Sequence, residues 1–215
     1  MRETLRKLAV VGAVLLIVFA VTRIDCEGRK VAGAPFTDAR DGKTYKTVII
    51  GGKRWMGENL NYLPQTGNSW CYNNKDSKCA KYGRLYDWNT AMTVCPPGWR
   101  LPSRQEWGNL VSEAGGTEIA GRKLKAKGDW GLWFFGGIAG NGEDSFGFSA
   151  LPGGIRWARL EGYFTNAGSS GMWWTAEDSG NGEVYHRYIH CTDDSVGERL
   201  FNKRQGISVR CVADK

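Results

Sequence analysis

The stretch Cys95–Trp107 reads CPPGWRLPSRQEW and holds the clearest structural signals in the sequence. Its prolines and Gly98 predict a turn, because proline fixes φ and glycine accepts conformations closed to other residues. Ser103 and Glu106 form a capping box, in which the serine oxygen and the glutamate side chain each accept a backbone amide at the helix start. The stretch therefore predicts a turn followed by a capped helix. Because its residues have structural roles, we expect function in the loops after Gly128.

The helix predicted after Ser103 continues with an apolar stripe. Apolar residues recur at i, i+3, i+4 and i+7, namely Trp107, Leu110, Val111 and Ala114. The pair Gly115-Gly116 predicts the end of this helix, because glycine adopts the left-handed conformation readily. Two further helices are predicted at Leu85–Met92 and Glu118–Ala126.

Strand signals surround the helices. Thr44–Ile50 and Lys53–Met56 flank a Gly-Gly turn and predict a β-hairpin. Beyond Gly128 helical periodicity gives way to glycine and aromatic residues, which indicates long loops broken by short strands. Further strands are predicted at Met172–Thr175, Val184–His190 and Gly206–Val212. The order of hairpin, helices, loops and antiparallel strands predicts an α+β domain.

The N-terminus differs from the rest of the chain. Basic residues precede Leu8–Val21, an apolar run of fourteen residues, which is the pattern of an export signal and is short for a membrane span of about 20 residues. Cleavage is expected after Ala20, and an uncleaved membrane anchor is the alternative. Both place the rest of the chain in the cell envelope, on the cell surface or in the medium. We therefore expect a signal or anchor (1–25), a linker (26–35) and one domain (36–215).

The charge pattern bears on the class of partner. The formal net charge of the 215 residues is +7, and the sequence has no run of five or more lysines and arginines. A nucleic-acid partner is therefore not expected. Contact with a membrane is expected only through the N-terminal segment.

The cysteines of the domain are expected to form disulfides, because an exported chain meets an oxidising compartment and no CxxC or zinc-finger spacing is present. Cys71 and Cys79 have the spacing of a local staple. Cys95 paired with Cys211 would join the front of the capped helix to the last strand. Cys191 competes for Cys211, since neighbouring antiparallel strands would bring the two together. We favour Cys95–Cys211, which leaves Cys191 single.

Several phrases, in order and spacing, resemble a known family. They are DGKTYKTVIIGGKRWMGENLNY, WCYNN followed by CAKYGRLYDW, CPPGWRLPSRQEW, GFSALPGG and SVRCV. From about Phe36 to Val212 the chain resembles the Fibrobacter succinogenes major paralogous domain. More distantly, RLPSRQEW with EAGG, and the final VRCVAD, are similar to the formylglycine-generating enzymes, whose fold is akin to C-type lectins. The resemblance implies that the first and last strands pair, that two helices flank them and that long loops bear the ligand surface.

The distant resemblance suggests an oxidase, which the residues do not support. The formylglycine-generating enzymes use a pair of cysteines shortly before the terminal strand to bind copper. The corresponding segment here, EDSGNGEVYHRYIHC, contains only Cys191. Related oxidases use a histidine-rich iron site, and His186 and His190 share one face of a strand at i and i+4. A third ligand would have to come from elsewhere, so we expect two exposed strand histidines and no metal.

Aromatic residues in the glycine-rich loop are the candidate ligand site. Exposed rings there would form a platform for sugar rings, while nearby amides and carboxylates bind hydroxyl groups. The alternative is that the rings fill the loop's own small core. The candidate residues are Trp130, Trp133, Phe134, Phe135, Asn141 and Asp144. The oxygens of Asn141, Glu143 and Asp144 would also suit calcium, but EF-hand spacing is absent and no cofactor is expected.

Together these features predict an exported, non-enzymatic binding or adhesion module held by two disulfides. Its expected partner is polysaccharide or another surface component, an inference by association, since one fold hosts many functions. A metal-dependent oxidase and a purely structural surface protein are the alternatives. The expected fold is C-type-lectin-like α+β, with an N-terminal hairpin, two main helices, long irregular loops and antiparallel strands.

Overall fold

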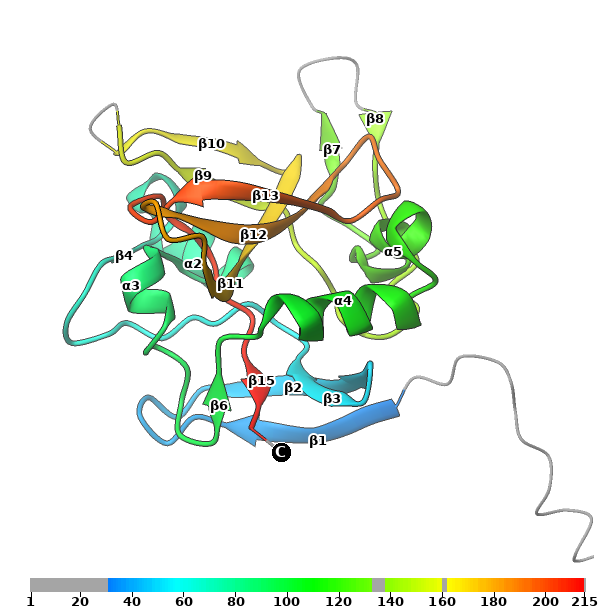
Figure 1. Cartoon of the computed structure of the whole chain (residues 1–215), viewed down its shortest axis with the longest axis horizontal. Helices are drawn as coiled ribbons and strands as arrows, with labels where there is room; N and C mark the ends of the chain where they lie inside the picture. The colour runs from blue at the N-terminus through cyan, green and yellow to red at the C-terminus, as the bar shows by residue number, and fades with distance from the viewer. Residues whose placement is uncertain (1–30, 133–137, 160–161, 215) are drawn as a thin grey trace, which may run out of the picture.

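A computed structural model describes residues 31–132, 138–159 and 162–214. These residues form a mixed α+β fold in which nearly all strand pairs are antiparallel. Two larger sheets lie on either side of helix α4 (Arg104–Glu113), as Figure 1 shows. Within the described ranges, no helix is long and apolar enough to cross a membrane.

The first sheet contains the predicted hairpin. Its strand order is β1 (Val31–Thr37), β2 (Thr44–Ile50), β3 (Lys53–Met56), β15 (Val212–Ala213) and β6 (Trp99–Arg100). The bounds predicted for β2 and β3 are confirmed to the residue. Strand β1 begins at Val31, inside the range predicted as a linker (26–35), and pairs with β2. Val212 pairs with Trp55, so the last strand joins the second strand of the hairpin and not β1.

The second sheet carries the remaining long strands. Its order is β13 (Gly197–Asn202), β12 (Glu183–His190), β11 (Ser170–Asp178), β14 (Ile207–Ser208), β5 (Leu85–Tyr86) and β4 (Ser69–Trp70). The predicted strand Gly206–Val212 divides into β14 and β15, which belong to different sheets. The chain between them therefore ties the two sheets together.

Two short ribbons lie beside the second sheet. Strands β9 (Gly153–Arg156) and β10 (Phe164–Ala167) form one ribbon, and β7 (Gly131–Leu132) and β8 (Ile138–Ala139) form the other. They lie in the region predicted as loops broken by short strands, and that prediction is confirmed.

The predicted capping box is confirmed at α4. Ser103 Oγ accepts from the Glu106 amide at 3.1 Å, and the Glu106 carboxylate accepts from the Ser103 amide at 2.9 Å. Arg100 also binds Glu106 through two hydrogen bonds of 2.6 and 2.7 Å and lowers the pKa of that carboxyl group to about 2. The signature motif thus fixes the helix start by charge as well as by capping.

The bounds of the other helices agree less closely with those predicted from the sequence. Helix α5 (Thr117–Leu124) confirms the third predicted helix, with an earlier end. The predicted helix Leu85–Met92 is wrong in its first half, where β5 pairs with β14 and β4. Asp87 then caps the single turn of α3 (Trp88–Ala91) by accepting from the Thr90 amide. The turn η1 (Tyr72–Asn74) and helix α2 (Asp76–Tyr82) were not predicted.

Buried aromatic rings fill the core between α4 and the sheets. Trp55, Trp107, Phe148 and Trp173 are each 0 % exposed and contact one another at centroid distances of 5.1 to 6.4 Å. Such edge-to-face pairs stabilise a core beyond the area that they bury. These three tryptophans therefore serve to pack the core.

Both predicted disulfides are present, and they indicate an oxidising compartment. Cys71 is bonded to Cys79, and Cys95 is bonded to Cys211. Cys191 is a free, buried thiol. The favoured pairing is therefore confirmed over the alternative that joined Cys191 to Cys211.

Candidate functional site

The structure removes Trp130 from the predicted aromatic platform. Its side chain is only 1 % exposed and lies in the core with Phe148 and Trp173. The indole N–H donates to the Ala150 carbonyl at 2.9 Å. Trp130 therefore follows the alternative interpretation, in which the ring fills a core. Trp133, Phe134 and Phe135 lie outside the described residues.

The polar side chains predicted to bind a ligand near the glycine-rich loop are engaged in contacts with the protein itself. Asn141 Oδ1 accepts from the Trp130 amide at 3.1 Å, and Asp144 accepts from the Ser149 amide and hydroxyl, both at 2.8 Å. Glu143 forms an ion pair with Arg122 at 3.1 Å. Calcium at these oxygens would have to displace protein partners. The structure thus gives Asn141 and Asp144 structural roles.

The two histidines do not form an exposed pair. His186 is 1 % exposed and stacks on Phe201 at a centroid distance of 3.9 Å, which corrects the prediction of an exposed residue. His190 is half-buried and bonds through Nδ1 to the Thr192 hydroxyl at 2.8 Å. Among the described residues, no group of three or more His, Cys, Asp or Glu is placed to hold a metal.

Burial of His186 makes stability depend on pH. Desolvation lowers the pKa of His186 from 6.5 to about 4, so the unfolded chain binds a proton that the folded chain rejects between these values. Its contribution is complete above pH 6.5 and is lost as the pH falls toward 4, by about 3 kcal/mol in all. Urea unfolding at pH 7 and pH 4.5 measures the loss. We expect His186→Phe to weaken this dependence, and an unchanged pH profile in that variant would contradict the assignment.

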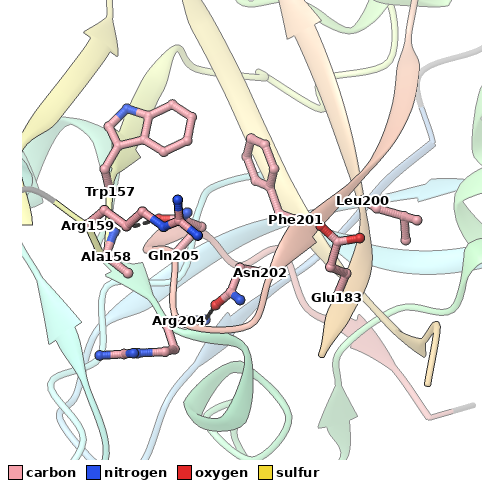
Figure 2. A pocket seen from close by; sticks show the side chains of 9 residues that line it. All are labelled: Trp157, Ala158, Arg159, Glu183, Leu200, Phe201, Asn202, Arg204 and Gln205. Carbon is pink, nitrogen blue, oxygen red and sulfur yellow. Dashed lines mark hydrogen bonds between the residues drawn. The ribbon is translucent and has the colours of Figure 1, made fainter. Parts of the chain in front are cut away.

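A groove of about 430 Å³ lies between the turn after β9 and the end of β13. Figure 2 shows its lining side chains at close range. They are Trp157, Ala158, Arg159, Glu183, Leu200, Phe201, Asn202, Arg204 and Gln205. The groove combines aromatic rings, amides and charges, so we take it as the candidate functional site and name it the β9–β13 groove.

Two half-buried rings form the aromatic part of the β9–β13 groove. Trp157 and Phe201 have centroids 5.8 Å apart with planes tilted by 59°. The Trp157 indole N–H donates to the Thr165 hydroxyl on β10 at 2.8 Å, which fixes the ring orientation. Phe201 is supported from behind by the buried ring of His186. The rings are thus held by the fold, and their placement does not depend on a ligand.

Two amide side chains, Gln205 and Asn202, line the β9–β13 groove. Gln205 is 8 % exposed, and its Oε1 accepts from the Ala158 amide at 2.6 Å, which ties the turn after β9 to the end of β13. Asn202 is exposed, and its Oδ1 accepts from the Arg204 amide at 3.1 Å. The amide nitrogen of each side chain stays available as a donor, because these bonds use only the oxygens.

Charges divide the groove into two ends. In Figure 2, Arg159 and Arg204 lie to the left of Phe201, whereas Glu183 and Leu200 lie to its right. Among the described lining residues, Glu183 is the one carboxylate, and none of them is a Ser, Thr, Cys or His. A paired acid and base or an activated nucleophile is therefore not formed by these side chains. The arrangement is suited to binding a polar ligand against two rings.

Sequence reasoning did not single out the groove residues. Trp157 follows the glycine pair of LPGGIRW, and Phe201 lies in RLFNKRQG, ahead of the last strand. Neither segment has a recurring chemical motif. The usable signal was a tryptophan directly after a short strand in the region beyond Gly128, where function was expected.

Comparison with known families and proteins gives the following result. A family model described as the Fibrobacter succinogenes major domain matches residues 48–213. No curated protein and no solved structure matches the chain. The matched range begins in β2 and ends in β15, so it spans both sheets and the β9–β13 groove.

Proposed function

The chain belongs to the Fibrobacter succinogenes major domain family, and we propose that this domain is an exported, non-enzymatic binding or adhesion module whose ligand is carbohydrate. We place the ligand in the β9–β13 groove and propose a C-type-lectin-like architecture for the domain. The observation that carries the proposal is the pairing of Trp157 and Phe201 beside free amide donors.

The chemistry of the groove suits a sugar ring. Apolar C–H faces of a sugar pack against aromatic rings, while its hydroxyl groups need donors and acceptors at the edge. Trp157 and Phe201 provide the apolar part, and Asn202, Gln205 and Glu183 provide the polar part. A groove with rings alone would favour an apolar ligand, and one with charges alone would favour a simple ion.

Export rests on the leader and on the disulfides. The apolar run Leu8–Val21 has the length of a signal core. The bonds Cys71–Cys79 and Cys95–Cys211 need a compartment in which disulfides persist. A module in that compartment meets cell-surface and environmental polysaccharides, which supports the proposed ligand class.

The oxidase alternative is disfavoured by the state of Cys191. The thiol is 4 % exposed, and burial raises its pKa, which lowers the thiolate fraction that binds metal or attacks a substrate. The cavity beside it, of about 490 Å³, also contains the buried ammonium group of Lys125, which donates to the Asp193 carbonyl at 2.8 Å. Within the described ranges the other cysteines are all in disulfides, so Cys191 has no second thiol as a partner, and the ammonium group of Lys125 lines the same cavity.

The proposed function is tested by removing the groove aromatics one at a time. We expect Trp157→Ala and Phe201→Ala to weaken glycan binding by the purified full chain about tenfold or more, because aromatic anchors dominate binding energy. Isothermal titration with the oligosaccharides found by a glycan screen measures the change. Tyr62→Ala is the matched control, since Tyr62 stacks on Arg40 and does not line the groove.

Two results would count against this assignment. Equal losses in the Tyr62 control and the groove variants would assign the effect to general destabilisation. A screen in which the folded, oxidised protein retains no glycan would remove carbohydrate as the ligand and favour the purely structural surface role. Circular dichroism of each variant establishes that it is folded before binding is measured.

A further inference from the structure

We propose that the β9–β13 groove takes an acidic sugar, with the ligand carboxylate at the end formed by Arg159 and Arg204. This inference rests on the proposed function and specifies its ligand class. It follows from the partners of the arginines, the division of charge along the groove and the placement of the two rings.

Arg159 and Arg204 differ from the other arginines of the described residues. Every other one has a hydrogen bond, an ion pair or an aromatic ring as a partner; these are Arg40, Arg54, Arg84, Arg100, Arg104, Arg122, Arg156, Arg187, Arg199 and Arg210. Within the described part of the chain, neither the Arg159 nor the Arg204 guanidinium group has such a partner. Both residues line the same groove and both are exposed.

Two guanidinium groups that have no partner among the described residues and that belong to lining residues on the same side of Phe201 indicate an anionic ligand group. A guanidinium presents a planar fork of N–H donors that matches a carboxylate and forms two parallel hydrogen bonds with it. The Arg204 backbone is held by Asn202 Oδ1, and the Ala158 amide next to Arg159 is held by Gln205. The bases of both side chains are therefore anchored while their charged ends stay free.

The opposite end has the chemistry for hydroxyl groups. Glu183 lies there and accepts hydrogen bonds, and it would repel a second acidic group placed against it. The rings of Trp157 and Phe201 contribute the apolar surface of the same groove. A single uronic acid residue satisfies all three parts, because it has a carboxylate, a ring with C–H faces and free hydroxyls. A polyanion without sugar rings would leave the aromatic part unused.

A methyl-ester comparison isolates the carboxylate. We expect the purified full chain to bind an oligogalacturonide at low ionic strength about tenfold more tightly than the methyl ester of the same oligosaccharide. The ester keeps every ring and hydroxyl group and lacks only the charge. The preference is expected to shrink as salt is raised, since exposed charges are screened.

Paired substitutions connect the preference to the arginines. Arg159→Gln with Arg204→Gln is expected to abolish the preference for the acid, so that this variant binds acid and ester with equal affinity. Lys75→Gln with Lys127→Gln is the control, because it removes the same amount of charge from exposed sites outside the groove. The control variant is expected to keep the preference.

The possible results separate this inference from the proposed function. Equal binding of acid and ester by the unaltered protein would overturn the acidic-sugar inference and leave the carbohydrate function standing. Equal binding of polyglutamate and oligogalacturonide, unaffected by Trp157→Ala, would overturn the sugar ligand and leave only an anion site. Loss of the preference in the lysine control would assign it to net charge and overturn the role of Arg159 and Arg204. Binding of none of these probes would overturn the acidic-sugar inference, while the glycan screen would still decide the carbohydrate function.

Discussion

Replacing Cys95 and Cys211 by alanine is expected to lower the free energy of unfolding by about 4–5 kcal/mol. The disulfide joins residues 116 positions apart, so its removal frees a long loop in the unfolded chain. It also ties the turn ahead of α4 to the segment between β14 and β15, which links the two sheets. We therefore expect removal of this disulfide to destabilise both sheets, which then unfold together.

The second disulfide is the internal control for this prediction. Cys71 and Cys79 are only eight positions apart, and the same chain-entropy relation gives about 2.5 kcal/mol for their removal. Urea unfolding of both double variants, followed by far-UV circular dichroism, compares the two losses. A larger loss for Cys71–Cys79 would show that native-state packing decides these energies and that loop length does not.

Local signals in the sequence predicted local structure well. The hairpin, the capping box at Ser103 and the Cys71–Cys79 disulfide are present as expected, because each depends on residues that are close in sequence. The stretch Leu85–Met92 is a case in which local signals gave the wrong structure. Its apolar spacing suits a helix, but Leu85 and Tyr86 pair with β4 and β14, and this distant pairing is invisible in a short window.

The candidate site was predicted only to its region of the chain. Trp130 has the same loop context as an exposed platform residue, yet it fills a cavity whose walls come from segments far away in sequence. Trp157 and Phe201 come together because β9 lies beside the second sheet, which no motif encodes. Contacts of this kind depend on topology, so side-chain exposure on loops could not be read from residue types.

A buried polar network explains two of the phrases that define the family resemblance. Asn59 belongs to GENLNY and Arg210 belongs to SVRCV. Asn59 Oδ1 accepts from Arg210 Nε at 3.2 Å, from Arg210 Nη2 at 2.8 Å and from Trp173 Nε1 at 2.8 Å. Arg210 Nη1 donates to the carbonyls of Met56 and Phe148. The network therefore connects both sheets through one guanidinium group.

Arg210 has no carboxylate partner within the described residues and is 0 % exposed. Burial lowers its pKa to about 9, so the group is still charged at pH 7. Oxygens of one amide and two carbonyls, with the Phe148 ring at 4.3 Å, solvate that charge. Glu58 and Asp144 raise the pKa of Arg210 through their charges, but its hydrogen-bond partners are all dipoles, so the group is sensitive to the loss of any one of them.

Asn59→Leu is accordingly expected to lower the free energy of unfolding by about 3–5 kcal/mol, because it leaves a buried charge and the Trp173 N–H without their acceptor. Adding Arg210→Met removes the stranded charge, so the double variant is expected to lose less than the sum of the single variants, with a coupling of about 1–3 kcal/mol. Urea unfolding of the four proteins at pH 7 measures this cycle.

Asn181→Leu, at an exposed turn, is the control and is expected to change stability by less than about 0.5 kcal/mol. Strict additivity of the two core substitutions would show that Asn59 does not stabilise the charge of Arg210, and the fold-defining role of this pair would then rest on packing alone.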